Sequence, residues 1–299
     1  MKRAAPLGVF DSGIGGLTVV RHLRRLLPER HIVYFGDTAR VPYGTKSAAT
    51  VNRFAVEAAR FLTLFGVDHL VVACNTVSAV ALHALEREFR GLPVHGVIEP
   101  GARAAVAATR SGRIGVIGTR ATVASGAYER AVAAAARAEG KRVRVHATPC
   151  PLLVPFAEEG MTNTPAVREV LRGYLADLRR RGIDTLILGC THYPPFKPAL
   201  RAVLGPRVTL IDSGEATARR LARAFHRSRN GGSRGARVGR VGRGAGPGRG
   251  SLECYVSDIP RHFEAVGRRF LGHPIGRVHL VEQDDLPWFE RHPKGPRGG

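Results

Sequence analysis

Short apolar runs alternate with longer stretches of helical periodicity along most of this chain. The apolar runs have the length and composition of strands buried on both faces of a parallel sheet. They predict strands at residues 7–10, 31–35, 69–73, 94–98, 113–117, 143–147, 185–189, 208–211, 253–256 and 277–281. The stretches between them predict helices at residues 17–27, 48–65, 75 to about 89, 121–139, 165–181, 212 to about 227, and 260–271. This alternation predicts an α/β fold with right-handed crossovers and mostly parallel sheets flanked by helices.

Two parts of the chain are similar to each other. The strand and turn at residues 7–12 resemble those at residues 113–119, and each part continues to a strand that ends in a cysteine. In open α/β sheets, ligands bind outside the carboxyl ends of the strands. The repeat therefore predicts that Cys74 and Cys190 are counterparts that face one shared cleft.

These two cysteines are followed by hydroxyl, amide or imidazole groups, in ACNT and GCTH. A single cysteine is most often a small buried apolar residue, but the matched settings favour paired reactive thiols. The C-x-H spacing of Cys190 and His192 matches no usual zinc pattern, so no metal is expected. The chain begins without a secretory signal, which favours a cytoplasmic protein with reduced thiols. Cys150 and Cys254 have no acid–base groups beside them and are predicted to be structural.

The loop at residues 11–16, DSGIGG, follows the first strand and leads into a helix. It lacks the third glycine of a dinucleotide-binding fingerprint, and Asp11 would repel a pyrophosphate. An ordinary glycine turn is one interpretation. The other is a cradle for a carboxylate, because free backbone amides at a helix start favour anions. Asp11 is then a polar partner beside Cys74.

The formal net charge of +22 raises nucleic acid as a partner. Residues 229–250 contain six arginines, nine glycines and no acidic residue. Such a segment buries too little apolar surface to offset its ordering entropy, so we expect a disordered surface insertion. Residues 295–299 are expected to be a frayed end. No stretch is long and apolar enough to predict a membrane span.

Several motifs together resemble glutamate racemases of the aspartate/glutamate racemase superfamily. They cover nearly the whole chain outside residues 229–250, and they are VFDSGIGGLTV at 9–19, GDTARVPYGTKS at 36–47, ACNTVSA at 73–79, CPLLVPFAEEG at 150–160, GCTHYP at 189–194 and IDSGEAT at 211–217. The resemblance implies two pseudo-symmetric α/β domains, residues 1–97 plus 212–299 and residues 98–211, with the active site in the cleft between them. It also implies a racemase that needs no cofactor and supplies D-glutamate for peptidoglycan.

The chemistry of racemisation suits two thiols, because one group can take the Cα proton while another delivers a proton to the opposite face. A free cysteine has a pKa of about 8.5, so we expect helix N-termini after both cysteines to favour the thiolate. By resemblance, Cys74 deprotonates the D-isomer and Cys190 the L-isomer, with Asp11 and His192 as relays. The motifs also carry substrate-contacting positions, namely Asp11, Ser12, Tyr43, Gly44, Asn75, Thr76, Thr191 and His192.

Asp37 and Glu158 match acidic residues that assist from the cleft, although a turn residue and a helix-surface charge are the alternatives. Thr119 and Thr122 are expected to add contacts from the second domain.

Three functions stay open at this point. A glutamate racemase, acting as a homodimer, is the first. An aspartate racemase is the neighbouring alternative, because one methylene group separates the two substrates. A nucleic-acid-binding protein that uses residues 229–250 belongs to a different class, and a racemase with weak nucleic-acid binding through that segment combines the two.

Overall fold

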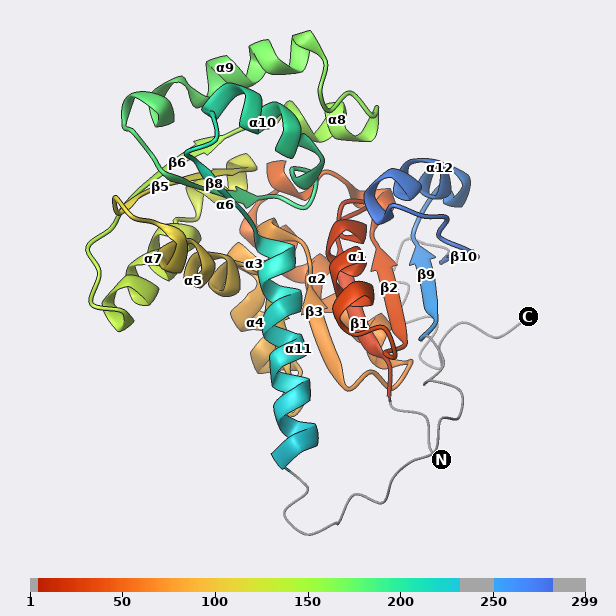
Figure 1. Cartoon of the computed structure of the whole chain (residues 1–299). Helices are drawn as coiled ribbons and strands as arrows, with labels where there is room; N and C mark the ends of the chain where they lie inside the picture. The colour runs from red at the N-terminus through yellow and green to blue at the C-terminus, as the bar shows by residue number, and fades with distance from the viewer. Residues whose placement is uncertain (1–4, 232–249, 282–299) are drawn as a thin grey trace, which may run out of the picture.

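The computed structural model describes residues 5–231 and 250–281, which form two parallel sheets (Figure 1). The first sheet has six strands, in the order β10 (Val278–Leu280), β9 (Leu252–Val256), β2 (Ile32–Gly36), β1 (Leu7–Asp11), β3 (His69–Val72) and β4 (Val94–Gly96). The second has four, in the order β6 (Arg144–Pro149), β5 (Arg113–Gly118), β7 (Thr185–Gly189) and β8 (Thr209–Asp212). All neighbouring strands in the described ranges pair in parallel, so the predicted α/β fold is confirmed.

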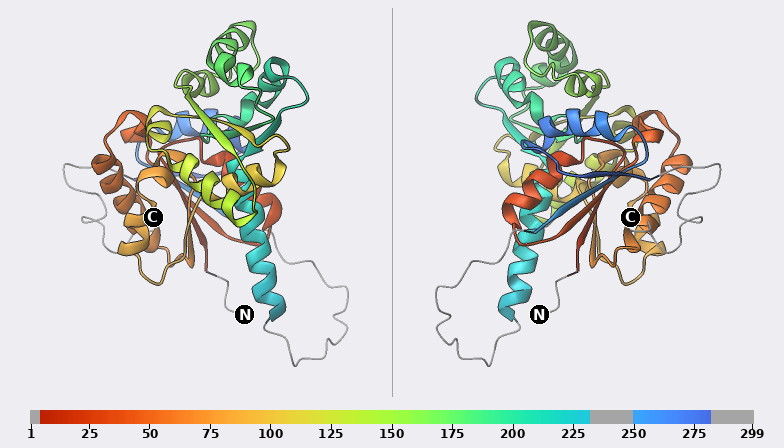
Figure 2. Two further views of the ribbon diagram at one scale, coloured as in Figure 1. Left: turned by 90° about the vertical axis from the view of Figure 1, so that its left-hand side faces the viewer. Right: turned by 90° about the vertical axis from the view of Figure 1, so that its right-hand side faces the viewer.

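Helices cover both faces of the sheets (Figures 1 and 2). Those of the first part of the chain are α1 (Leu17–Leu26), α2 (Ala48–Thr63), α3 (Asn75–Val80), α4 (Leu82–Glu88) and α5 (Ile98–Ala108). They are followed by α6 (Arg120–Ala124), α7 (Ala127–Ala138), α8 (Leu153–Glu158), α9 (Pro165–Arg180), α10 (Lys197–Leu204), α11 (Ser213–Gly231) and α12 (Pro260–Leu271). Helix α11 packs against α1 and α5, so it joins the two halves of the molecule. None of the described helices combines the length and apolar character that a membrane crossing requires.

One cluster of buried apolar side chains extends from the first sheet into the second half of the molecule. It holds Leu7 and Val9 of β1 together with Leu186 and Leu188 of β7. The opposite face of the first sheet is packed by aromatic residues, among them Phe10. Successive β1 residues thus point to opposite, equally buried faces, as a strand between two helical layers requires.

Three helices were not expected from the sequence. Each of α5, α8 and α10 contains a proline, Pro100, Pro155 or Pro198, within its first turn. Proline is tolerated there because the first amides of a helix have no intrahelical acceptor. The predicted strand at residues 94–98 is accordingly shorter, since α5 already begins at Ile98.

Two predicted helices are interrupted. The stretch 121–139 is divided into α6 and α7 by Gly126, whose φ of +64° is left-handed. The stretch 75–89 is divided into α3 and α4 at Ala81. Helix α2 is bounded by a capping side chain and a glycine: Ser47 Oγ accepts from Thr50 N at 3.3 Å, and Gly66 adopts a φ of +65° after the helix.

The boundaries expected for the disordered insertion are wrong at both ends. Helix α11 continues to Gly231, so residues 229–231 are helical. Gly250 is held by backbone contacts, because its amide donates to Pro28 O at 2.8 Å and its carbonyl accepts from Arg24 at 3.3 Å. The remainder, residues 232–249, and the predicted frayed end at 295–299 lie outside the described residues. The domain boundaries expected from the sequence stay a prediction.

Candidate active site

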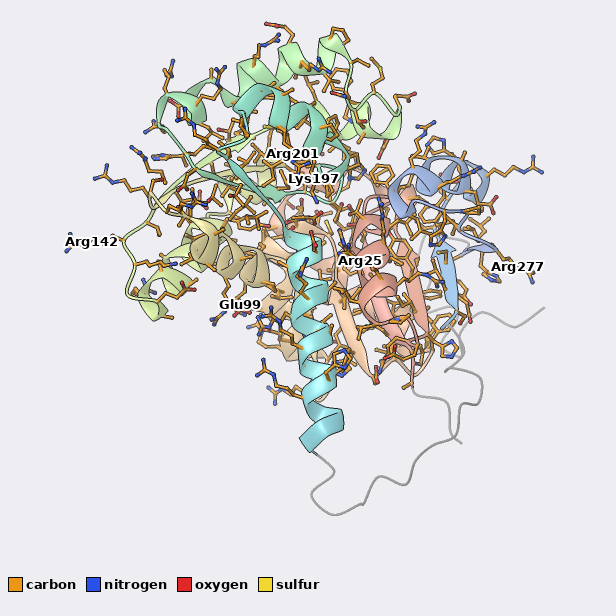
Figure 3. The ribbon with its side chains drawn as sticks, in the orientation of Figure 1. Arg25, Glu99, Arg142, Lys197, Arg201 and Arg277 are labelled. Atoms are coloured by element: carbon orange, nitrogen blue, oxygen red, sulfur yellow. The ribbon has the colours of Figure 1, made fainter. Side chains whose placement is uncertain are left out.

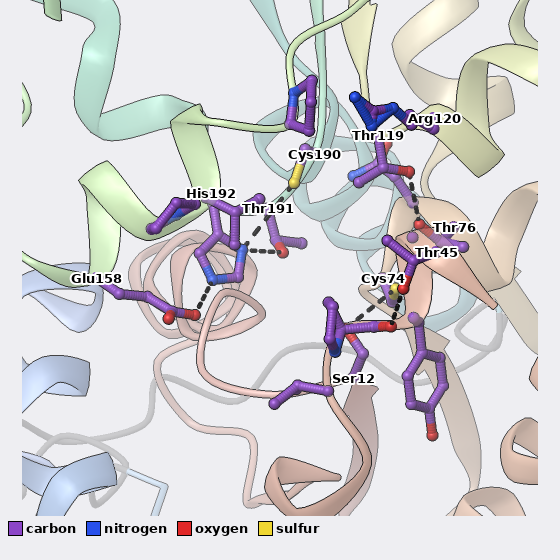
Figure 4. A pocket seen from close by; sticks show the side chains of 18 residues that line it. Ser12, Thr45, Cys74, Thr76, Thr119, Arg120, Glu158, Cys190, Thr191 and His192 are labelled. Carbon is purple, nitrogen blue, oxygen red and sulfur yellow. Dashed lines mark hydrogen bonds and ion pairs between the residues drawn. The ribbon is translucent and has the colours of Figure 1, made fainter.

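A cavity of about 290 Å³ lies where the carboxyl ends of β1, β3 and β7 meet the loops around them (Figure 4). Residues of both halves line it. They are Ser12, Val41, Pro42, Tyr43, Gly44, Thr45, Cys74, Asn75, Thr76, Thr119, Arg120, Pro151, Val154, Pro155, Glu158, Cys190, Thr191 and His192. The two cysteines that the repeat predicts to be counterparts therefore face one cavity, each from its own sheet.

Cys74 follows β3 and precedes the first residue of α3. Its thiol donates to Ser12 Oγ at 3.5 Å. Burial raises the pKa of the Cys74 thiol to about 12, and the neighbouring Asp11 carboxylate adds to the rise. The helix start was expected to favour a thiolate, but desolvation outweighs it here. Burial therefore favours the thiol form of Cys74 at neutral pH.

Cys190 has a different partner. Its Sγ lies 4.0 Å from His192 Nδ1, and His192 Nε2 lies 2.9 Å from Glu158 Oε1 (Figure 4). Burial alone would lower the pKa of His192, but Cys190 and Glu158 together raise it to about 10. The imidazole is then a cation that lies beside Cys190 and is paired with Glu158. The expected helix N-terminus does not follow directly, because residues 191–193 form a turn before the 3-10 helix Pro194–Phe196.

Asp11 lies beneath the cavity and does not line it. Its side chain is fully buried, where it accepts from Gly13 N at 3.1 Å and from Thr191 Oγ1 at 3.4 Å. Burial raises the pKa of Asp11, an effect that the nearby His192 opposes. Asp11 thus joins the first sheet to the turn that carries Cys190 and His192.

The glycines of the DSGIGG loop also lie outside the cavity lining. A Cβ atom on Gly15 would overlap Thr191 Oγ1 and His192 Nδ1, so the glycine permits the close approach of these two residues. The role of the loop as a carboxylate cradle stays a prediction, and its Gly15 packs against the second half of the molecule.

Asn75 offers a buried donor to the cavity. Its Oδ1 accepts from Tyr128 OH at 2.6 Å and from Ser213 Oγ at 3.4 Å. Its Nδ2 has no hydrogen-bond partner among the described residues. A buried donor without an acceptor is costly, so this amide is a candidate to bind a ligand oxygen.

Three hydroxyl groups meet beside Asn75. Thr76 Oγ1 lies 3.0 Å from Thr119 Oγ1 and 3.3 Å from Thr122 Oγ1. Thr76 belongs to the first half of the cavity and the other two to the second. Thr122 is buried behind the lining, so the contacts expected from it reach the cavity through Thr76 and Thr119.

Tyr43 and Gly44 line the cavity from the 3-10 turn Tyr43–Thr45, while Asp37 is buried behind them. Asp37 accepts from Tyr43 OH, from Arg40 Nε at 2.7 Å and from Ser257 Oγ at 2.9 Å. Asp37 therefore acts on the cavity through Tyr43.

Several lining residues were missed by the sequence reasoning. The quoted motifs gave a signal for those that fall within them, which are Val41, Pro42, Thr45, Pro151, Val154 and Pro155. Arg120 falls outside every quoted motif, and its position depends on how α6 docks beside the cavity.

One group of possible metal ligands occurs among the described residues, and it lies away from the cavity. It consists of His22, Asp212 and Glu215. Lys197 Nζ already donates to Asp212 at 2.8 Å, and Arg25 pairs with Glu215 at 3.1 Å. Figure 3 shows Lys197 and Arg25 near the start of α11. Both carboxylates are therefore already paired with cations. The group is an ion-pair cluster that joins the two halves.

Two thiols from separate sheets, with a histidine–carboxylate pair beside one of them, form an acid–base site. Over residues 13–221 the chain matches the Asp/Glu/hydantoin racemase family, and it belongs to this family. A glutamate racemase of Geobacter metallireducens is 47% identical over 275 residues, covering 92% of this chain and 96% of the relative. The family expected from the motifs is confirmed.

Solved structures agree with this assignment. A glutamate racemase isoform of Bacillus anthracis superposes with a TM-score of 0.83 at 38% identity, covering 96% of this chain and 99% of that one. A glutamate racemase of Francisella tularensis in complex with D-glutamate gives a TM-score of 0.82 at 35% identity, covering 95% of this chain and all (100%) of that one.

Proposed function

We propose that this chain is a glutamate racemase that interconverts L- and D-glutamate by two-base proton transfer at Cα. The observation that carries the proposal is the pair of thiols, Cys74 and Cys190, which reach one cavity from two different sheets. The relatives support it, since the chain spans nearly the full length of glutamate racemases with 47% identity in the case of Geobacter metallireducens.

In the L-to-D direction, the Cys190 thiolate takes the Cα proton and becomes a thiol. The carbanion then takes a proton from the Cys74 thiol on the opposite face, and Cys74 is left as the thiolate. The reverse direction begins from that state. The surroundings of the two thiols support the first half, because burial keeps the proton on Cys74 and a cationic His192 lies beside Cys190. Each turnover exchanges one proton and needs no cofactor.

Polar groups around the thiols hold the substrate. Asn75 Nδ2 supplies a donor to a carboxylate, and Ser12, Thr76 and Thr191 supply hydroxyl groups. Donors aimed at the α-carboxylate stabilise the negative charge that develops when the Cα proton leaves. Glu158 orients His192, and Asp11 fixes the turn that carries it.

Glutamate is favoured over aspartate as the substrate. The two differ by one methylene group, which a fitted pocket discriminates by about 1–3 kcal/mol. The Francisella tularensis relative was solved with D-glutamate, and it covers nearly the whole of this chain. The product D-glutamate then enters peptidoglycan synthesis in the cytoplasm.

We also propose that the active enzyme is a homodimer and that residues 229–250 give weak, salt-sensitive binding to nucleic acid. The six arginines of that segment support the second proposal, because phosphate contacts release counterions.

Proton exchange with solvent tests the function directly. Purified protein is incubated with L-glutamate or L-aspartate in deuterated buffer, and optical rotation and deuterium at Cα are followed. We expect the optical rotation of the glutamate sample to be lost and deuterium to be incorporated at Cα of the product isomer. Both results should be unchanged when a chelator is present. Faster racemisation of aspartate than of glutamate would show that aspartate is the substrate. Inactivation by the chelator, or pyridoxal absorbance in the pure protein, would contradict the two-thiol mechanism.

A further inference from the structure

The cavity has a buried floor and an exposed mouth. Cys74, Asn75, Cys190 and His192 are all buried. The exposed lining residues within the described ranges are Val41, Pro42, Thr45, Arg120 and Pro155. Arg120 is the charged member of this set, so it determines the electrostatic character of the mouth.

The position of Arg120 is fixed by its neighbours. It is the first residue of α6 and follows Thr119, whose Oγ1 caps that helix by accepting from Thr122 N at 3.2 Å. Gly44 packs against Thr119 so closely that an added Cβ would lie 2.7 Å from Thr119 Cβ. Figure 4 shows Arg120 next to Thr119 at the edge of the pocket. The capped helix start therefore fixes the backbone of Arg120 at the edge of the pocket.

Arg120 forms no ion pair within residues 5–231 and 250–281, whereas Arg40 is paired with Asp37 and with Glu57. Inside the cavity, the His192 cation is paired with the Glu158 carboxylate. The charge that Arg120 adds at the mouth is positive. Glutamate has two carboxylates and one ammonium group, so its net charge of about −1 at neutral pH is attracted to this entrance.

The burial of the thiols also determines which end of the substrate faces Arg120. Cα must reach the floor, between Cys74 and Cys190, for proton transfer to occur. The far end of glutamate, its side-chain carboxylate, then lies toward the mouth. We propose that Arg120 captures this side-chain carboxylate and selects dicarboxylic amino acids over neutral ones of the same shape. This inference rests on the proposed function, and Arg120 acts on binding without taking part in proton transfer.

Substitution of Arg120 by Gln, compared with Arg120→Lys and Arg137→Gln, tests the proposal. Arg137 is an exposed arginine of α7 outside the cavity lining, so its substitution removes the same net charge elsewhere. We expect Arg120→Gln to raise KM for glutamate by about five- to ten-fold at low salt, with kcat nearly unchanged. The dependence of kcat/KM on ionic strength should flatten. Arg120→Lys should keep most of the wild-type behaviour, and Arg137→Gln all of it.

Equilibrium binding of glutamate and glutamine, an uncharged isostere, provides a readout that is independent of turnover. We expect Arg120→Gln to weaken glutamate binding and leave glutamine binding nearly unchanged. A wild-type protein that binds glutamate without racemising it would refute the proposed function, while the glutamate-to-glutamine comparison would still decide the role of Arg120. Equal behaviour of Arg120→Gln and Arg137→Gln, or a fall in kcat at constant KM, would overturn the inference.

Discussion

At the scale of single residues, the two thiols differ although their strands are equivalent. Cys74 has Ser12 and the buried Asp11 beside it, and Cys190 has a histidine cation. We expect Cys74→Ala and Cys190→Ala each to reduce racemisation by at least about 10²- to 10⁴-fold, since one face of Cα loses its acid or base. The measurement is the initial rate of racemisation from each isomer.

Cys254→Ala serves as the matched control, because Cys254 is buried in β9 away from the cavity. It should keep a substantial rate. Near-normal turnover by either of the other two variants would rule out the two-thiol scheme.

Glu158 acts on the site through His192. Its carboxylate helps to raise the pKa of His192 to about 10, so Glu158→Gln should lower that pKa and reduce the fraction of imidazolium at pH 8. We expect kcat/KM from L-glutamate to fall by about ten-fold, and its decline at alkaline pH to begin at a lower pH. A pH profile in both directions checks this result. The neighbouring exposed Glu159, substituted by Gln, should leave the profile unchanged, and an identical profile for Glu158→Gln would contradict the role assigned to it.

At the scale of elements, β3 and β4 carry a histidine pair at the edge of the first sheet. His69 Nδ1 lies 2.9 Å from His95 Nε2, and the His69 ring packs edge-on against Phe225 of α11. Burial lowers both pKa values, and that of His95 falls to about 4 with help from His69 and Arg220. Asp68 opposes the effect at His69, while Arg30 adds to it.

The unfolded chain therefore binds more protons than the folded one below the ordinary histidine pKa of about 6.5. The stabilisation from this pair is complete above that pH and is lost as the pH falls toward 4. We expect Tm to fall less between pH 7 and pH 5 in His95→Gln than in the wild type. His83→Gln, a change at an exposed histidine of α4, should keep the wild-type slope. Equal slopes for all three proteins would exclude the pair as the cause.

Element types could be predicted where local pattern and tertiary packing agree. The continuous apolar runs of β1, β3 and β7 are buried on both faces, so their sequences admit one interpretation. Helices α5 and α10 were not predicted, and each has a proline in its first turn, where proline is tolerated. The division between α6 and α7 depends on the conformation of Gly126, which composition alone does not reveal.

At the scale of the whole molecule, the motifs predict which residues lie near the site. They do not predict whether a side chain lines the cavity or is buried behind its lining. Asp11 and Asp37 lie at strand ends just as Ser12 and Cys74 do, yet both are buried behind the cavity lining. The close approach of the two halves at Gly15 determines this difference, and it arises from tertiary docking. Arg120 could not be predicted from the sequence for the same reason. This exposed arginine lines the cavity only because α6 docks beside the residues of the first half.

The last prediction concerns residues 232–249, which join α11 to the segment before β9. Gly250 is already fixed by Pro28 and Arg24, and none of the cavity-lining residues comes from α11 or β9. The entropic cost of closing a loop changes slowly with its length, so a shorter connection is tolerated if it spans the same ends. We expect replacement of these residues by a glycine–serine linker of similar reach to retain the fold and the racemase rate within about two-fold. The same variant should lose the low-salt retardation of DNA that the arginines support. Circular dichroism, racemisation and DNA retardation at two salt concentrations measure these outcomes. A folded variant that has lost racemisation would show instead that this segment helps to build the active site.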